Sequence, residues 1–274
     1  GQLDLVVIDE AGQFSLAKTL AVALAGSRLL LLGDPQQLPQ VSTGSHPDPV
    51  DESALGWLLG GDPVVPATHG YFLERTWRMH PRLTEAVSEL SYAGELLSQE
   101  AVTAVRAIAG VEPGLHSVEV DHRENMTWSP EEVEVVVNLV GSLLGRDFAP
   151  GAGEARRPLA QSDVIVITPY NAQVSALRIA LTGAGLADVP VGTVDKFQGQ
   201  EAAVAIVSLA ASGAGGVGVS RGLEFLLSRN RLNVAISRGQ VAAYLVHGRG
   251  LREVAPSTPK DLLALGAFLR LLGS

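Results

Sequence analysis

The chain has 274 residues, of which 46% are hydrophobic, and it carries a formal net charge of −9. This length allows one large domain or two ordinary ones, each with its own buried core. The absence of cysteine excludes disulfides and thiolate metal sites. The negative charge argues against binding of nucleic acid by bulk electrostatics, so any such binding must use a local groove.

Targeting and membrane signals are missing from the sequence. No apolar run reaches the roughly 18 residues that a membrane span needs, and there is no basic-then-apolar secretory start. Together with the lack of cysteine, these features lead us to expect a cytoplasmic protein with no membrane contact.

Predicted strands and helices alternate along the chain, which indicates an α/β fold with mostly parallel sheets. In the first part we expect a strand at 3–8, a helix at 16–25, a strand at 28–32, a loop at 41–52 and a short helix at 52–59. In the second part we expect helices near 81–92 and 130–144, strands at 164–167, 204–209 and 242–246, and a last helix from 258. The stretches 145–161 and 210–222 are expected to be mobile.

A domain boundary is predicted near residue 74. Residues 1–74 supply only two recognisable strands, too few for a doubly wound sheet, so we expect part of a larger domain. Residues 75–274 are sufficient for a complete second domain.

Polar residues follow two successive predicted strands. Asp9 and Glu10 come directly after the first strand, and Asp34 and Gln37 follow the second. Ligands bind at the carboxyl edge of open α/β sheets, where one carboxylate can hold Mg²⁺ and a neighbour can activate water. Gln37 could reach a phosphate oxygen or that water. Acidic residues also serve as helix caps, and Gly-Asp-Pro is an ordinary turn, so both interpretations stay open.

Six motifs then occur in a fixed order. They are DEAGQ at 9–13, GDPQQLP at 33–39, TWRMHP at 76–81, TPYNAQ at 168–173, TVDKFQGQE at 193–201 and RLNVAISRG at 231–239. In this order they resemble the superfamily 1B helicases, most of all the branch typified by the nonsense-mediated-decay helicase. The resemblance covers nearly the whole chain. The first 60 residues further resemble the helicase portion of some bacterial proteins that fuse a RecB-like nuclease to such a motor.

The resemblance implies RecA-like folds of the P-loop NTPase class, with a partial first motor domain at 1–74 and a complete second domain at 75–274. It also implies ATP in the cleft between the two domains. The implied nucleotide site has Asp9 on Mg²⁺, Glu10 on the attacking water, Asp34 and Gln37 on the γ-phosphate, Arg78 and Arg238 as arginine fingers, and Gly199 and Glu201 on the γ-phosphate and ribose.

The resemblance further implies a single strand of nucleic acid across the top of both domains, with DNA favoured over RNA. Thr168 and Thr193 would contact phosphates, beside Asn171. Tyr170 could stack on a base. The alternative is that residues 169–171 only start a helix and Tyr170 lies in the core.

The chain departs from the family in several respects, among them Trp77 in place of a tyrosine and Gln40 in place of a second proline. Gly239 and Gln240 replace the usual alanine and basic residue. More important, no P-loop is present, and the sequence contains no Gly-Lys dipeptide. The P-loop cradles the β- and γ-phosphates, and each charge-assisted hydrogen bond is worth roughly 1.5–3 kcal/mol. We therefore expect the chain alone to be a poor ATPase that needs an upstream P-loop segment of the same parent protein.

Three functions fit these observations to different degrees. The first is the carboxyl-terminal portion of an ATP-dependent helicase or translocase. The second is a non-enzymatic module with a RecA-like fold that binds nucleic acid or protein. The third is a Mg²⁺-dependent hydrolase that uses Asp9, Glu10 and Asp34, which would leave Arg78 and Arg238 without a role.

Overall fold

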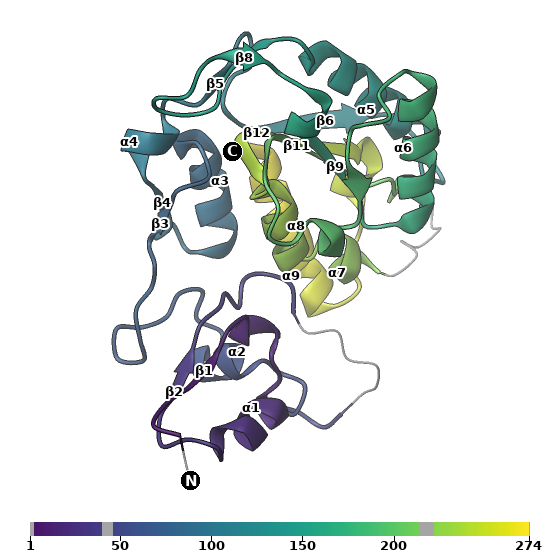
Figure 1. The fold of residues 1–274 in the computed structure, drawn as a ribbon. Coiled ribbons are helices and arrows are strands. Elements are labelled where there is room, and N and C mark those ends of the chain that lie inside the picture. Colours follow the sequence, from purple (N-terminus) through teal and green to yellow (C-terminus); the bar gives the residue numbers. More distant parts are fainter. Residues whose placement is uncertain (1–2, 40–45, 214–221, 274) are drawn as a thin grey trace.

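The computed structural model describes residues 3–39, 46–213 and 222–273 (Figure 1). Its main feature is a five-stranded sheet in the order β10-β9-β11-β12-β6, in which every neighbouring pair is parallel. The strands are β6 (Gly114–Val120), β9 (Val164–Ile167), β10 (Val191–Gly192), β11 (Ala202–Ser208) and β12 (Gly239–Gly248). The predicted α/β class with a parallel sheet is confirmed.

Helices cover both faces of this sheet (Figure 1). Strand β9 is buried at all four positions, and its side chains alternate between two cores. Val164 and Val166 join the core with α5 (Pro130–Leu143) and α6 (Asn171–Gly183). Ile165 and Ile167 join the core with α3 (Pro81–Ser91), α8 (Arg229–Ile236) and α9 (Pro259–Gly273). Such continuous apolar strands are typical of parallel sheets that are buried on both sides.

Helix α5 begins with a capping serine and a proline. The Ser129 hydroxyl accepts a hydrogen bond from the Glu132 amide at 3.1 Å, and Pro130 occupies the first turn. Short elements complete this part of the chain: α4 (Glu100–Thr103), α7 (Leu223–Leu226) and the parallel pair β3 (Arg75–Thr76) and β4 (Leu97–Ser98).

One expected loop contains structure. Residues 145–161 include β7 (Asp147–Ala149) and β8 (Arg157–Pro158), which pair antiparallel with each other. Strand β7 also pairs with β5 (Ala107–Ile108). The cause is burial, because Phe148 and Leu159 both lie in the core beneath α5 and α6. Within the other expected loops at 41–52 and 210–222, residues 41–45 and 214–221 lie outside the described residues.

The first part of the chain contains β1 (Val6–Ile8) and β2 (Leu29–Leu31), which form a parallel pair, together with α1 (Leu16–Ala23) and α2 (Ala54–Leu59). All four elements agree with the predicted ranges within a few residues. A small core of Val6, Ile8 and Ala11 packs against Leu31 of β2 and Leu55 of α2. Across the described ranges, none of the helices combines the length and the apolar character that crossing a membrane requires.

Candidate nucleotide site

The loops after β1 and β2 are held against each other. The Ala11 amide donates to the Leu32 carbonyl at 2.8 Å. A Cβ atom on Gly33 would lie 2.7 Å from the Ala11 nitrogen, and one on Gly12 would overlap the Asp34 carbonyl oxygen. Only glycine allows this close approach. The two predicted pairs of polar residues therefore lie at one edge of the β1–β2 sheet.

Glu10 has an unusual backbone conformation at this edge. Its φ of 53° and ψ of 39° lie in the left-handed region, which residues other than glycine seldom occupy. The Asp9 carboxylate accepts the Glu10 amide at 2.9 Å and so helps to hold this turn. Strain of this kind costs about 1–3 kcal/mol and is concentrated at functional sites.

Asp34 and Gln37 contact each other directly. One carboxylate oxygen of Asp34 accepts the Gln36 amide at 2.9 Å, and the other accepts the Gln37 side-chain amide at 3.1 Å. The second oxygen also accepts the Tyr92 hydroxyl at 2.6 Å. Asp34 therefore connects the loop after β2 with the residue that follows α3.

The two predicted arginine fingers lie in one charged cluster with Glu201. Arg78 donates to the Glu201 carboxylate at 2.7 Å and to the Ser237 carbonyl at 3.2 Å. Arg238 is only 2% exposed, and its guanidinium donates to the Val234 carbonyl at 2.9 Å. Ser237 immediately precedes Arg238, so the Arg78 bond ties the two arginines together.

Burial and charge shift the pKa values in this cluster. Burial, followed by the charge of Arg78, lowers the pKa of Arg238 to about 10, against the opposing influence of Tyr92, Glu201 and Asp34. Burial alone would raise the pKa of the Glu201 carboxyl, but the hydrogen bond and charge of Arg78 hold that pKa below its usual value. The cluster therefore presents charged guanidinium groups beside an ionised carboxylate at neutral pH.

Gln240, which stands where the family has a basic residue, has a defined place here. Its side-chain amide donates to the second Glu201 oxygen at 2.9 Å. Gly199 lies on the loop that carries Glu201, and its φ is 78°. A Cβ atom at this position would meet nothing within 4 Å. The glycine is thus needed for its backbone conformation and not for space.

The four residues predicted to contact nucleic acid differ in accessibility. The Thr168 side chain is fully buried. Tyr170 is also buried, packs its ring 6.0 Å from that of Phe225, and directly precedes α6. Tyr170 therefore lies in the core at the start of a helix, as the alternative interpretation describes. Asn171 and Thr193 have side chains that reach solvent at the carboxyl ends of β9 and β10.

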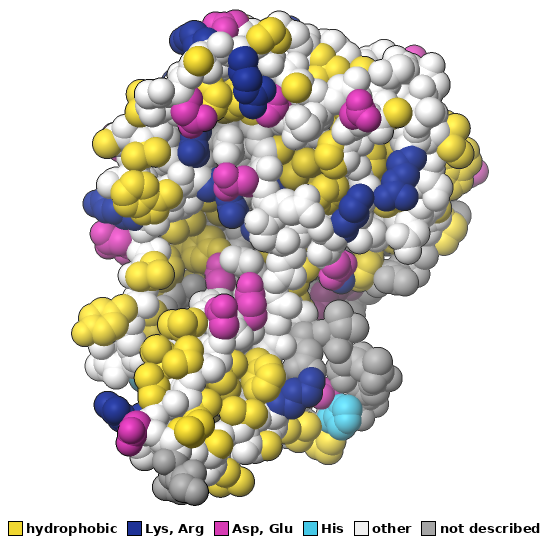
Figure 2. Space-filling view, in the orientation of Figure 1, with side chains coloured by type: hydrophobic (Ala, Val, Ile, Leu, Met, Phe, Trp, Pro, Cys, Tyr) yellow, Lys and Arg dark blue, Asp and Glu magenta, His cyan; other side chains and the backbone are white. Residues whose placement is uncertain are grey.

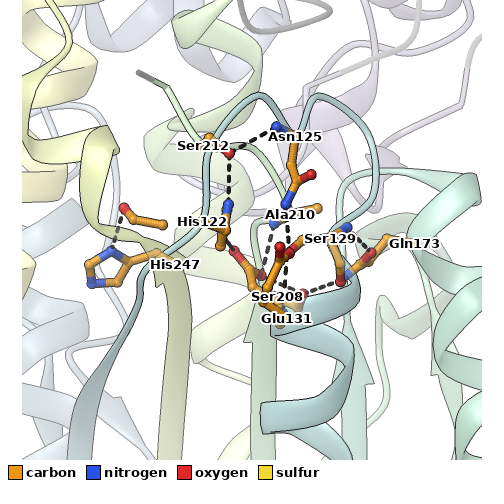
Figure 3. A network of polar contacts seen from close by, with 11 residues as sticks. His122, Asn125, Ser129, Glu131, Gln173, Ser208, Ala210, Ser212 and His247 are labelled. Carbon is orange, nitrogen blue, oxygen red and sulfur yellow. Dashed lines mark hydrogen bonds and ion pairs between the residues drawn. The ribbon is translucent and has the colours of Figure 1, made fainter. Parts of the chain in front are cut away.

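A buried polar network lies beneath the same sheet edge and was not predicted (Figure 3). Glu132 is fully buried, and its carboxylate lies 3.0 Å from His122 Nε2. It also accepts the Ser208 hydroxyl at 2.7 Å and the Ala210 amide at 2.9 Å. His122 Nδ1 lies 2.7 Å from the Ser212 hydroxyl. The network therefore joins α5 and the segment after β6 to the end of β11.

The sequence contained only a weak signal for this network. Glu131 and Glu132 are equivalent as acidic residues in the first turn of a predicted helix. Nothing in the sequence shows that the first stays near the surface while the second points into the core. His122 has no partner at a recognisable spacing, since its contacts come from residues far along the chain.

Comparison with known proteins agrees with the motif order. One AAA domain family matches residues 64–249, and a second AAA domain family matches residues 1–43. The first match covers more than half of the chain. The chain therefore belongs to the AAA domain family, and it corresponds to the carboxyl-terminal part of the motor core of superfamily 1 helicases.

Three curated relatives illustrate the match. The uncharacterized ATP-dependent helicase C05C10.2 of Caenorhabditis elegans is 29% identical over 266 residues, or 90% of this chain and 16% of the relative. RNA helicase Mov10l1 of Homo sapiens is 29% identical over 272 residues, which are 87% of this chain and 22% of the relative. The uncharacterized ATP-dependent helicase MJ0104 of Methanocaldococcus jannaschii is 24% identical over 270 residues, which are 91% of this chain and 36% of the relative. The chain thus spans between 16% and 36% of the length of these relatives.

Proposed function

We propose that the chain is part of an ATP-driven motor that moves on single-stranded nucleic acid, with DNA favoured over RNA. The observation that carries the proposal is the cluster of Arg78, Glu201 and Arg238. A separate contact, between Tyr92 and Asp34, joins the same part of the chain to the loop after β2. A pure binding module has no need for an acidic residue in a strained turn, a polar Gln37 and two such arginines in one chain. The three relatives support the class, since each is named as a helicase.

The residues fit a magnesium nucleotide in their chemistry. Asp9 would hold Mg²⁺, which neutralises charge on phosphate oxygens, and Glu10 would take a proton from the attacking water. Gln37 would turn from Asp34 toward the γ-phosphate. Arg78 and Arg238 would stabilise the charge that develops on the transferred phosphoryl group.

We also propose that an upstream segment of the same protein completes the first domain and supplies the P-loop. Val7 and Leu30 on the β1–β2 sheet are 51% and 43% exposed. Figure 2 shows hydrophobic side chains gathered over this lower part of the molecule. Parallel strands are normally covered on both faces, and patches of this kind mark contact surfaces. The division at residue 74 and a cytoplasmic location, which the absence of cysteine supports, belong to the same proposal.

A substitution of Thr193 tests the nucleic-acid part of this function. In the full-length protein, Thr193→Ala is expected to weaken binding of a single strand by about three- to tenfold, because one hydrogen bond to phosphate is lost. Basal ATP hydrolysis should change less. Fluorescence anisotropy with labelled single-stranded DNA and RNA, beside a phosphate-release assay, measures both quantities.

Thr182→Ala is the matched control, since Thr182 is exposed near the far end of α6. An equal loss of strand binding and basal hydrolysis would show that Thr193 is structural. Strand binding by the unchanged full-length protein with no ATP hydrolysis would favour the binding-module alternative.

A further inference from the structure

The loop after β2 docks against the second part of the chain. Leu38 at its end is only 4% exposed and lies in the core formed by α3, α8 and α9. The same core contains Met79, Tyr92 and Leu232. The residue directly after Gln37 is therefore anchored among helices of the other part of the molecule.

Helix α8 binds the backbone of this loop through two asparagines. The Asn230 side-chain amide donates to the Pro35 carbonyl at 2.9 Å and to the Gln37 carbonyl at 2.6 Å. The Asn233 side-chain amide donates to the Gln36 carbonyl at 2.8 Å. Three consecutive carbonyl groups of the loop thus accept hydrogen bonds from one helix, which fixes the path of the loop and not just one side chain.

Tyr92 completes the attachment. Its buried hydroxyl donates to Asp34 at 2.6 Å and accepts the Asn233 amide at 3.0 Å. Burial, followed by the charge of Asp34, raises the pKa of Tyr92 far above its usual value, so the hydroxyl keeps the proton that it donates. Asn233 therefore contacts the loop both directly and through Tyr92.

We propose that Tyr92, Asn230 and Asn233 are positioning residues. They hold the loop after β2, which carries Asp34 and Gln37, in a fixed position relative to Arg238. Helix α8 ends at Ile236, two residues before Arg238, so the helix that carries the asparagines also places the arginine. Asp34 and Gln37 are thereby tied to the same unit as the arginine. The inference rests on the proposed function, since the relative position of Gln37 and Arg238 matters when both side chains act on one phosphate. A misplacement of about 1 Å can cost a hundredfold in rate.

Hydrogen exchange on this chain tests the attachment without any assumption about function. Asn230→Ala removes two hydrogen bonds, and Tyr92→Phe removes only the hydroxyl. Each is expected to speed amide exchange in a peptide over residues 34–39 by about tenfold. The matched controls are Asn138→Ala, on the exposed face of α5, and Tyr244→Phe, on β12, where Tyr244 stacks on His116. Exchange as slow as in the controls would overturn the inference.

Kinetics of the full-length protein test the positioning role. Both substitutions are expected to lower kcat for ATP about tenfold and to change KM less than about threefold, because the loss falls on the chemical step. In a Gln37→Ala background, Tyr92→Phe should have almost no further effect. Fully additive losses, or a change in KM alone, would contradict the positioning role. If the unchanged protein does not hydrolyse ATP, the proposed function fails, while the exchange measurement still decides the attachment.

Discussion

Glu132→Ala is expected to lower the free energy of unfolding of this chain by about 3–5 kcal/mol, because three buried polar groups lose a hydrogen-bond partner at a cost of about 1–3 kcal/mol each. The substitution leaves His122 and the Ser208 hydroxyl without their shared partner inside the protein. It also removes the acceptor of the Ala210 amide, which lies two residues after the end of β11. Each buried polar group left without a partner adds its own desolvation cost.

Urea denaturation followed by circular dichroism measures this effect. Glu134→Ala provides the control, since Glu134 is exposed on the same helix two residues away. We expect that control to change stability by less than about 0.5 kcal/mol. If Glu132→Ala were as mild as Glu134→Ala, the network in Figure 3 would not contribute to stability as described.

Glu10→Gln in the full-length protein is expected to reduce ATP turnover at least about a hundredfold, the range for loss of a general base. Glutamine keeps the size of the side chain and the left-handed turn but cannot accept a proton from water. Nucleotide binding should remain, because Asp9, Arg78 and Arg238 are unchanged. A single-turnover hydrolysis assay and a separate binding titration distinguish the two effects.

Glu95→Gln, at an exposed turn after α3, serves as the control and should leave turnover unchanged. Turnover by the Glu10→Gln protein close to that of the control would refute the assignment of Glu10. Equal losses of binding and turnover would instead indicate that Glu10 holds the nucleotide and does not act on water.

The sequence predicted the parts of the fold that have continuous apolar runs. Strands β9, β11 and β12 are buried along almost their whole length, and the predicted ranges overlap all of them. Strand β6 was missed because it lies at the sheet edge and carries polar His116, Ser117 and Glu119. Strand β10 was missed because it has only two residues.

The candidate site also contains residues that the sequence predicted and residues that it did not. The motif order predicted Arg78, Arg238 and Glu201, and the structure brings these three together. Tyr92 and Asn230 were not predicted, since a tyrosine and an asparagine near helix ends are ordinary residues there. Their importance depends on partners more than fifty positions away in the sequence, which only tertiary packing reveals.

Equilibrium binding of a fluorescent ATP analogue with Mg²⁺ tests the central claim most directly. The measurement compares this chain with the same chain extended upstream through the proposed P-loop segment. We expect binding only by the longer chain, because the residues present here need the phosphate cradle that a P-loop provides. Tight binding by the shorter chain would contradict the account, since it would require a nucleotide site that does not depend on a P-loop.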